Sequence, residues 1–190
     1  MTGVTAGTVL HLRSRRVPAA ALLLAVTAGA VWGVGRFGDG AADPRLVALA
    51  AAGGVSAASV GLAGQDPALD RTAALRWVPR RAVHVVLVAA AVALALLVAG
   101  APGAQLGPWE VLVRLCAGSA GLVAFAAACW GAQHAWVLPL GWFAVVLFAP
   151  VRQGFPDWIL APPGDGAAAW TATVLLAGGT ATYAVLGPRR

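Results

Sequence analysis

The chain has 190 residues, of which 60% are hydrophobic and only 11% are charged, and its formal net charge is +6. A soluble domain usually carries about a quarter charged residues, so one water-soluble core cannot bury this much apolar surface, and we expect the lipid bilayer to be the main solvent. The basic residues are all Arg and lie at the ends of apolar runs, which favours a role in membrane orientation over nucleic-acid binding.

Six apolar runs are predicted to form membrane-spanning helices. The first, 17–35, follows an Arg-rich flank, so a cleaved signal peptide is the alternative interpretation of this run. The fifth is short and contains Pro139 and Gly141, but the uncharged stretch around it is too long for one straight helix. The sequence therefore predicts an all-α polytopic membrane protein, with residues 1–190 as one transmembrane domain. The six predicted spans are 17–35, 46–64, 82–100, 111–130, 135–150 and 167–186.

The distribution of Arg predicts the orientation of these spans. Six spans place both termini on one side of the membrane, together with nine Arg residues, whereas the other side holds Arg36, Arg45 and Arg152. Basic residues concentrate on the cytoplasmic side, so both termini are predicted to lie inside the cell. Most tryptophans, Trp158 included, fall near the ends of predicted spans, where amphipathic rings meet the two membrane interfaces, and only Trp142 lies well inside a run.

The stretch 65–81 is a charged interruption between the second and third runs, and it is predicted to form a short helix at the inner membrane surface. Asp66 is a suitable N-cap, Pro67 suits the first helical position, and Pro79 predicts an end by Val78. The helix is either a connector that orients two spans or a docking helix for a soluble partner. Its candidate docking residues are Asp66, Leu69, Asp70, Arg71, Arg76 and Trp77.

Few ionisable residues come near the predicted spans. Glu110 and Arg114 are four residues apart at the outer start of the fourth run, so they share a helix face. They are either a polar lining at the outer mouth of a pathway, or a contact for an anionic head group, or a structural ion pair with Arg114 extending to the interface. His84 and His134 begin spans on the cytoplasmic side and can act as a pH-sensitive pair or as interfacial hydrogen-bonding groups. No catalytic, phosphate-binding or metal-binding motif is found.

The loop 151–166 is too apolar to be simply solvated, so a short interfacial or re-entrant segment is predicted there. With six spans, both termini inside and a helix at 66–77, the chain resembles the permease of a type-2 ATP-binding-cassette exporter. Such permeases have a cytoplasmic coupling helix between spans two and three, which 66–77 matches, and outer re-entrant helices between spans five and six, which 155–163 matches. The resemblance is architectural. The chain is short for this family, and its N-terminal amphipathic segment is only a stub around 11–16.

The resemblance implies a permease subunit of the bacterial cytoplasmic membrane that moves a hydrophobic or amphipathic substrate. A separate ATP-binding subunit would carry ATP and Mg²⁺ and would contact residues 66–77, while this chain would need no cofactor and no nucleic acid. The permease would pair with a second copy or a second permease subunit among the membrane lipids. The alternative, from another class, is a non-transporting accessory, assembly or immunity protein that acts through helix–helix contacts in the membrane.

Overall fold

The computed structural model describes Gly29, Gly33 and residues 43–59, 77–101, 106–148 and 155–187. No strand occurs in these ranges, so the predicted all-α class is confirmed for the described part of the chain. The elements are α3 (Pro44–Ala58), α5 (Trp77–Gly100), α6 (Trp109–Trp130), the 3₁₀ turn η2 (Ala132–His134), α7 (Val137–Phe148), the 3₁₀ turn η3 (Phe155–Ile159) and α8 (Gly166–Leu186).

Helix α3 begins with a favourable N-terminal sequence. The side chain of Asp43 accepts a hydrogen bond from the backbone N–H of Arg45 at 2.9 Å, and Pro44 occupies a first-turn position, where its missing N–H removes no helical bond. The helix has 15 residues, which corresponds to about 22 Å. The predicted second span runs on to residue 64, and its part beyond Ser59 lies outside the described residues, as does the first predicted span except for the helical Gly29 and Gly33.

Helix α5 begins at Trp77, before the predicted start of the third span at residue 82. Pro79 lies in the first turn of this helix, where the backbone N–H groups have no helical acceptor, so the proline is tolerated. A proline disfavours helical geometry in the residue before it, but here Val78 is helical and belongs to α5. The predicted helix end at Val78 is therefore wrong. Trp77, which was predicted to close the docking helix, instead opens α5. The other predicted docking residues, Asp66, Leu69, Asp70, Arg71 and Arg76, lie outside the described residues.

Three helices are long and apolar enough to cross a membrane, judged by length and composition: α5 from Val78 onward, α6 and α8. Their 24, 22 and 21 residues correspond to about 36, 33 and 32 Å, compared with about 30 Å for the hydrocarbon core. Helix α7 has 12 residues, or about 18 Å, and residues 149–154 lie outside the described ones, so the fifth span, 135–150, stays a prediction. The described helices thus indicate a membrane protein with three candidate spans.

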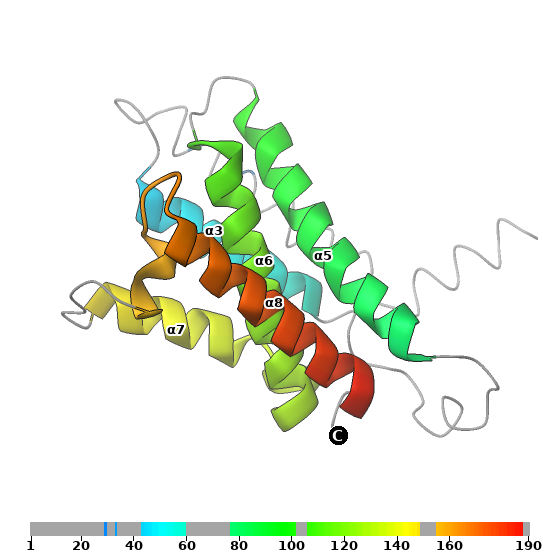
Figure 1. Ribbon diagram of the computed structural model, residues 1–190. Coiled ribbons are helices and arrows are strands. Elements are labelled where there is room, and N and C mark those ends of the chain that lie inside the picture. Colours follow the sequence, from blue (N-terminus) through cyan, green and yellow to red (C-terminus); the bar gives the residue numbers. More distant parts are fainter. Residues whose placement is uncertain are drawn as a thin grey trace, which may run out of the picture.

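Helix α6 lies at the centre of the bundle, and α3, α5, α7 and α8 all contact it (Figure 1). Within the most apolar window of each helix, 78% of α6 is buried, compared with 28% for α5 and 28% for α8. The outer helices therefore turn broad apolar faces away from the protein, among them Leu87 and Leu94 on α5 and Val174 and Val185 on α8. Such faces suit contact with lipid chains.

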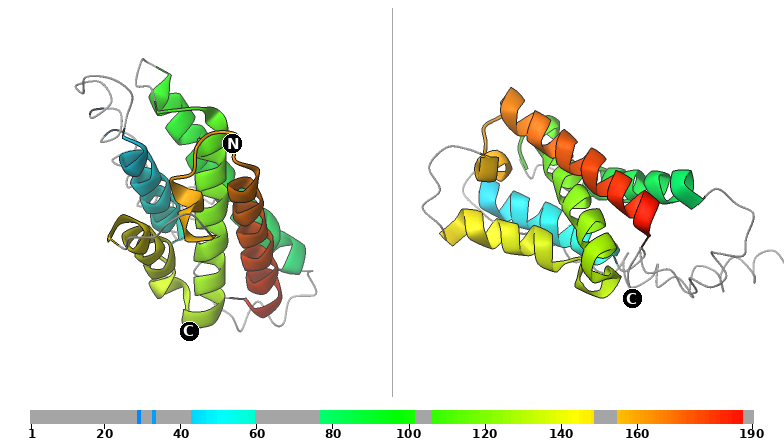
Figure 2. Two further views of the ribbon diagram at one scale, coloured as in Figure 1. Left: turned by 60° about the vertical axis from the view of Figure 1, so that its left-hand side comes forward. Right: turned by 60° about the horizontal axis from the view of Figure 1, so that its bottom comes forward.

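Helices α6 and α8 run in the same direction, and α5 runs opposite to both (Figure 2). In agreement, Arg81 in the first turns of α5 lies against Gly187 at the end of α8. Because α6 and α8 are parallel, residues 131–165 must return from the end of α6 to its start. Helix α7 lies on this return path beside α3, and η3 follows it.

Candidate functional site at the start of helix α6

Arg114 is the one buried cation among the described residues, and it lies in the second turn of α6. Its side chain is only 7% exposed. One terminal nitrogen, Nη1, donates a hydrogen bond to the carbonyl oxygen of Pro162 at 3.0 Å, and Nη2 donates to the carbonyl oxygen of Ala161. The planar fork of a guanidinium suits two neighbouring acceptors, whereas an ammonium is a point charge. Arg114 thus binds the backbone of the segment that leads into α8.

The two carbonyls lie in an irregular turn. The carbonyl of Pro162 also accepts a hydrogen bond from the backbone N–H of Asp165 at 3.4 Å, and Gly164 has a positive φ of 80°, a conformation that favours glycine. The next residue, Asp165, caps α8 by accepting hydrogen bonds from the backbone N–H groups of Ala167 at 2.9 Å and Ala168 at 3.1 Å. Its carboxylate also attracts the Arg114 cation. The turn therefore presents both acceptors and negative charge to Arg114.

Trp158 anchors the same segment one helical turn further along α6. Its side chain is 2% exposed. A Cβ added at Gly118 would lie 2.5 Å from the indole Cζ3 and 3.0 Å from Cζ2, so the ring lies directly on the α6 backbone. Arg114 and Gly118 are four residues apart and share a helix face. We call residues 157–165 the strap; it is held to this face by Trp158 and by the carbonyls of residues 161 and 162.

The lower part of α6 contacts α8 backbone to backbone. A Cβ added at Gly179 would lie 2.6 Å from the carbonyl carbon of Gly121, and one added at Gly121 would lie 2.5 Å from the backbone nitrogen of Leu176. Small residues at such crossings let membrane helices approach closely and gain van der Waals contact. One side of α6 therefore joins the strap near its start and α8 at its middle, so these three elements form one packed unit.

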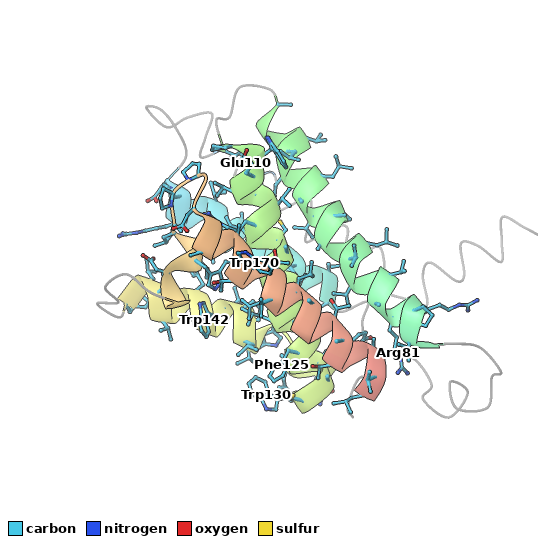
Figure 3. The ribbon with its side chains drawn as sticks, viewed as in Figure 1. Arg81, Glu110, Phe125, Trp130, Trp142 and Trp170 are labelled. Carbon is cyan, nitrogen blue, oxygen red and sulfur yellow. The ribbon has the colours of Figure 1, made fainter. Side chains whose placement is uncertain are left out.

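Glu110 lies in the first turn of α6 and is exposed, at the end of the bundle opposite Arg81 and Trp130 (Figure 3). Its charge is favourable there because a helix N-terminus attracts anions. Within the described ranges no ion pair joins Glu110 to Arg114, whose terminal nitrogens bind the strap instead. Arg114 therefore has a different partner from the carboxylate that the four-residue spacing suggested, and a role of the two residues in a pathway stays a prediction.

The opposite end of the bundle carries the other polar groups. A Cβ added at Gly187 would lie 2.7 Å from Nη1 of Arg81, so this cation lies at the C-terminus of α8, where the helix dipole favours positive charge. His134 is exposed, and its Nδ1 lies 3.4 Å from the carbonyl oxygen of Trp130. Its partner in the predicted pair, His84, lies in α5 and is half-buried.

Five of the described tryptophans separate into two groups, and Trp142 in α7 is half-buried. Trp109 and Trp170 near one end and Trp130 and Trp136 near the other are all exposed, as expected for rings at membrane interfaces. Trp158 differs, because it is buried against Gly118. Neither this contact nor the crossing of α6 and α8 was predicted from the sequence. Glycines spaced along apolar runs are the available signal, but the sequence does not say which partner each glycine meets.

Among the described residues, no three His, Cys, Asp or Glu side chains lie close enough to hold a metal ion. No family model matches the chain, and neither a curated protein nor a solved structure matches it.

Proposed function

We propose that the chain is the permease subunit of an ATP-driven transporter, a multi-pass protein of the bacterial cytoplasmic membrane with six spans and both termini inside the cell. The observation that carries the proposal is the strap between α7 and α8, the helices of the fifth and sixth proposed spans. The strap packs on the start of α6 through Trp158 and Arg114, whereas a simple loop would only link the two helices. Type-2 ATP-binding-cassette exporters have short re-entrant helices between spans five and six.

In this proposal the start of α6, with the strap, faces the outside, and the start of α5 faces the cytoplasm. A separate ATP-binding subunit carries ATP and Mg²⁺ and contacts residues 66–76. Helix α5 begins at Trp77, next in sequence to the proposed docking residues, so a displacement of those residues acts on a spanning helix. Closure of two ATP-binding subunits then tilts α5 against the packed unit of α6, α8 and the strap. The permease acts as a homodimer or with a second permease subunit.

The character of the interior supports an apolar or amphipathic substrate. Among the described residues the only buried polar or charged side chains are Ser56, Ser59, Arg114 and Ser119. A hydrophilic solute moving through a bundle needs a continuous set of polar partners, because unpaired polar groups are costly in an apolar medium. The described interior favours a substrate that moves along the protein–lipid boundary.

The test is purification of the full-length tagged chain from its native membranes. We expect an ATPase to co-purify, and we expect Asp70→Arg and Arg71→Glu to lose it while reaching the membrane at normal levels. Arg45→Glu is the matched control, because it reverses an exposed charge at the start of α3, on the proposed outer side. Retention of the ATPase and of transport by Arg71→Glu would exclude the docking role.

A second candidate function is a non-transporting accessory or assembly protein. The backbone contact between Gly121 and Gly179 favours it, because that contact makes α6 and α8 a fixed scaffold with little polar interior. In this case the same purification yields a different membrane protein in stable complex and no ATPase. The charge reversals at Asp70 and Arg71 would then leave the complex intact.

A further inference from the structure

Arg114 is a buried charge held by neutral groups. Two of its nitrogens donate to the carbonyls of Ala161 and Pro162, and its Nε is buried with no hydrogen-bond partner among the described residues. Asp165 attracts it through space while the Oδ1 of this carboxylate caps α8. A charged side chain within an apolar segment is costly, and such residues mark functional elements. The stability of the buried cation thus depends on the strap staying in place.

We propose that Arg114 and Gly118 form a latch that holds the strap closed against α6, and that the strap can open as a unit. The proposal goes beyond the permease assignment and does not depend on it. Opening withdraws both carbonyls from Arg114 and the indole of Trp158 from Gly118, which exposes this face of α6 to the aqueous side. Closure restores the charge-assisted hydrogen bonds and reburies the ring.

The chemistry of the strap favours movement as a unit. Pro162 and Pro163 fix their own φ angles, so the two carbonyls leave or reach Arg114 together. Gly164, with φ at 80°, lies between this stiff pair and the N-cap of α8 and can absorb the change in backbone angles. The other end carries Trp158, whose ring is buried against Gly118. The strap therefore has a stiff centre, an adaptable end at Gly164 and an anchored end at Trp158.

The latch can be tested by thiol labelling of the purified full-length protein in detergent micelles, where the reagent reaches both ends of the bundle. The native cysteines are first replaced, as Cys116→Ala and Cys129→Ala, and the reporter is Ile159→Cys, because Ile159 lies in the strap and is 5% exposed. A water-soluble maleimide should label this reporter slowly. Ala167→Cys, at an exposed position at the start of α8, should label quickly in every background and corrects for the amount of protein.

Arg114→Gln should raise the labelling rate of the Ile159→Cys reporter at least about tenfold, because local opening follows the loss of charge-assisted hydrogen bonds. Arg114→Lys should give an intermediate rate, because an ammonium cannot bind both carbonyls as the planar fork does. Gly118→Ala should also accelerate labelling, because its Cβ would overlap Trp158. Gly141→Ala in α7 is the matched control, because its Cβ would meet nothing within 4 Å and the rate should not change.

Folding of each variant is checked by a single symmetrical gel-filtration peak in detergent. If Arg114→Gln fails this check, Gly118→Ala decides. Slow labelling in a folded Gly118→Ala or Arg114→Gln protein would overturn the latch. The latch would also be overturned if the Ile159→Cys reporter, with Arg114 and Gly118 intact, were labelled as fast as Ala167→Cys, because the strap would then not be held. Equal acceleration of labelling by Gly141→Ala would overturn it as well.

Discussion

Two adjacent glycines in α8 offer a sharp test of the helix crossing. A Cβ at Gly179 would overlap the backbone of Gly121, at 2.6 Å from its carbonyl carbon and 2.9 Å from its Cα, whereas a Cβ at Gly178 would meet nothing within 4 Å. Gly178→Ala and Gly179→Ala therefore make the same chemical change in the same helix. Only the second pushes α6 and α8 apart.

The expected difference follows from van der Waals packing. Ordinary contacts of a Cβ begin at 3.4 Å, so the helices must separate by about 1 Å, and a gap of about this size removes a quarter to a half of the attraction of each affected contact. Overpacking costs about 1–3 kcal/mol, and we expect a value of about 3 kcal/mol, because both clashing partners are backbone and cannot rotate away. The helix-propensity gain of about 1 kcal/mol applies to both variants and cancels in the comparison.

The assay is unfolding of the purified protein by SDS in mixed micelles, followed by circular dichroism. Gly179→Ala should unfold at a clearly lower SDS fraction than Gly178→Ala, which should match the parent protein or exceed it slightly. Equal unfolding curves for the two variants would refute the backbone contact between α6 and α8. A Gly121→Ala variant should repeat the Gly179 result, because its Cβ would overlap Leu176 of α8.

Three further results are expected. Asp165→Ala should lower the free energy of unfolding by about 1 kcal/mol, because it removes the N-cap of α8. Asp165→Asn should retain most of this stability, because Asn also caps helices. Chemical denaturation of both variants measures the difference. Maleimide should label Cys129 before Cys116 in the folded protein, because Cys116 is 1% exposed and Cys129 is partly exposed. In denaturant the two labelling rates should converge. Peptide mass spectrometry measures both rates. On intact cells an impermeant maleimide should label Glu110→Cys but not His134→Cys. Both positions are exposed, but Glu110 lies at the start of α6 and His134 lies in η2, just after the end of α6. The reverse pattern would invert the proposed orientation.

Several parts of the fold could be predicted because they depend on local properties. Hydropathy and length predict α6 and α8, which the runs 111–130 and 167–186 cover almost entirely. The caps at Asp43 and Asp165 were not predicted, although they are local too, because each side chain accepts a hydrogen bond from a backbone N–H two residues ahead.

Other features could not be predicted because they join distant parts of the chain. The bond from Arg114 to Ala161 spans 47 residues, and the helical spacing of Glu110 suggested a nearer partner. The sequence contains 24 glycines, so nothing distinguished Gly118 as the one that receives an indole. The start of α5 was missed for a different reason, because Pro79 is compatible with a first helical turn as well as with a break.

The contact between Arg114 and the strap has a consequence for biosynthesis. The translocon releases a helix into lipid when its own length and hydropathy suffice, whereas the strap depends on a partner from elsewhere in the chain. Its carbonyls at Ala161 and Pro162 accept hydrogen bonds from Arg114. Arg114 precedes Ala161 by 47 residues, so during synthesis the donors on α6 exist before the strap that they hold.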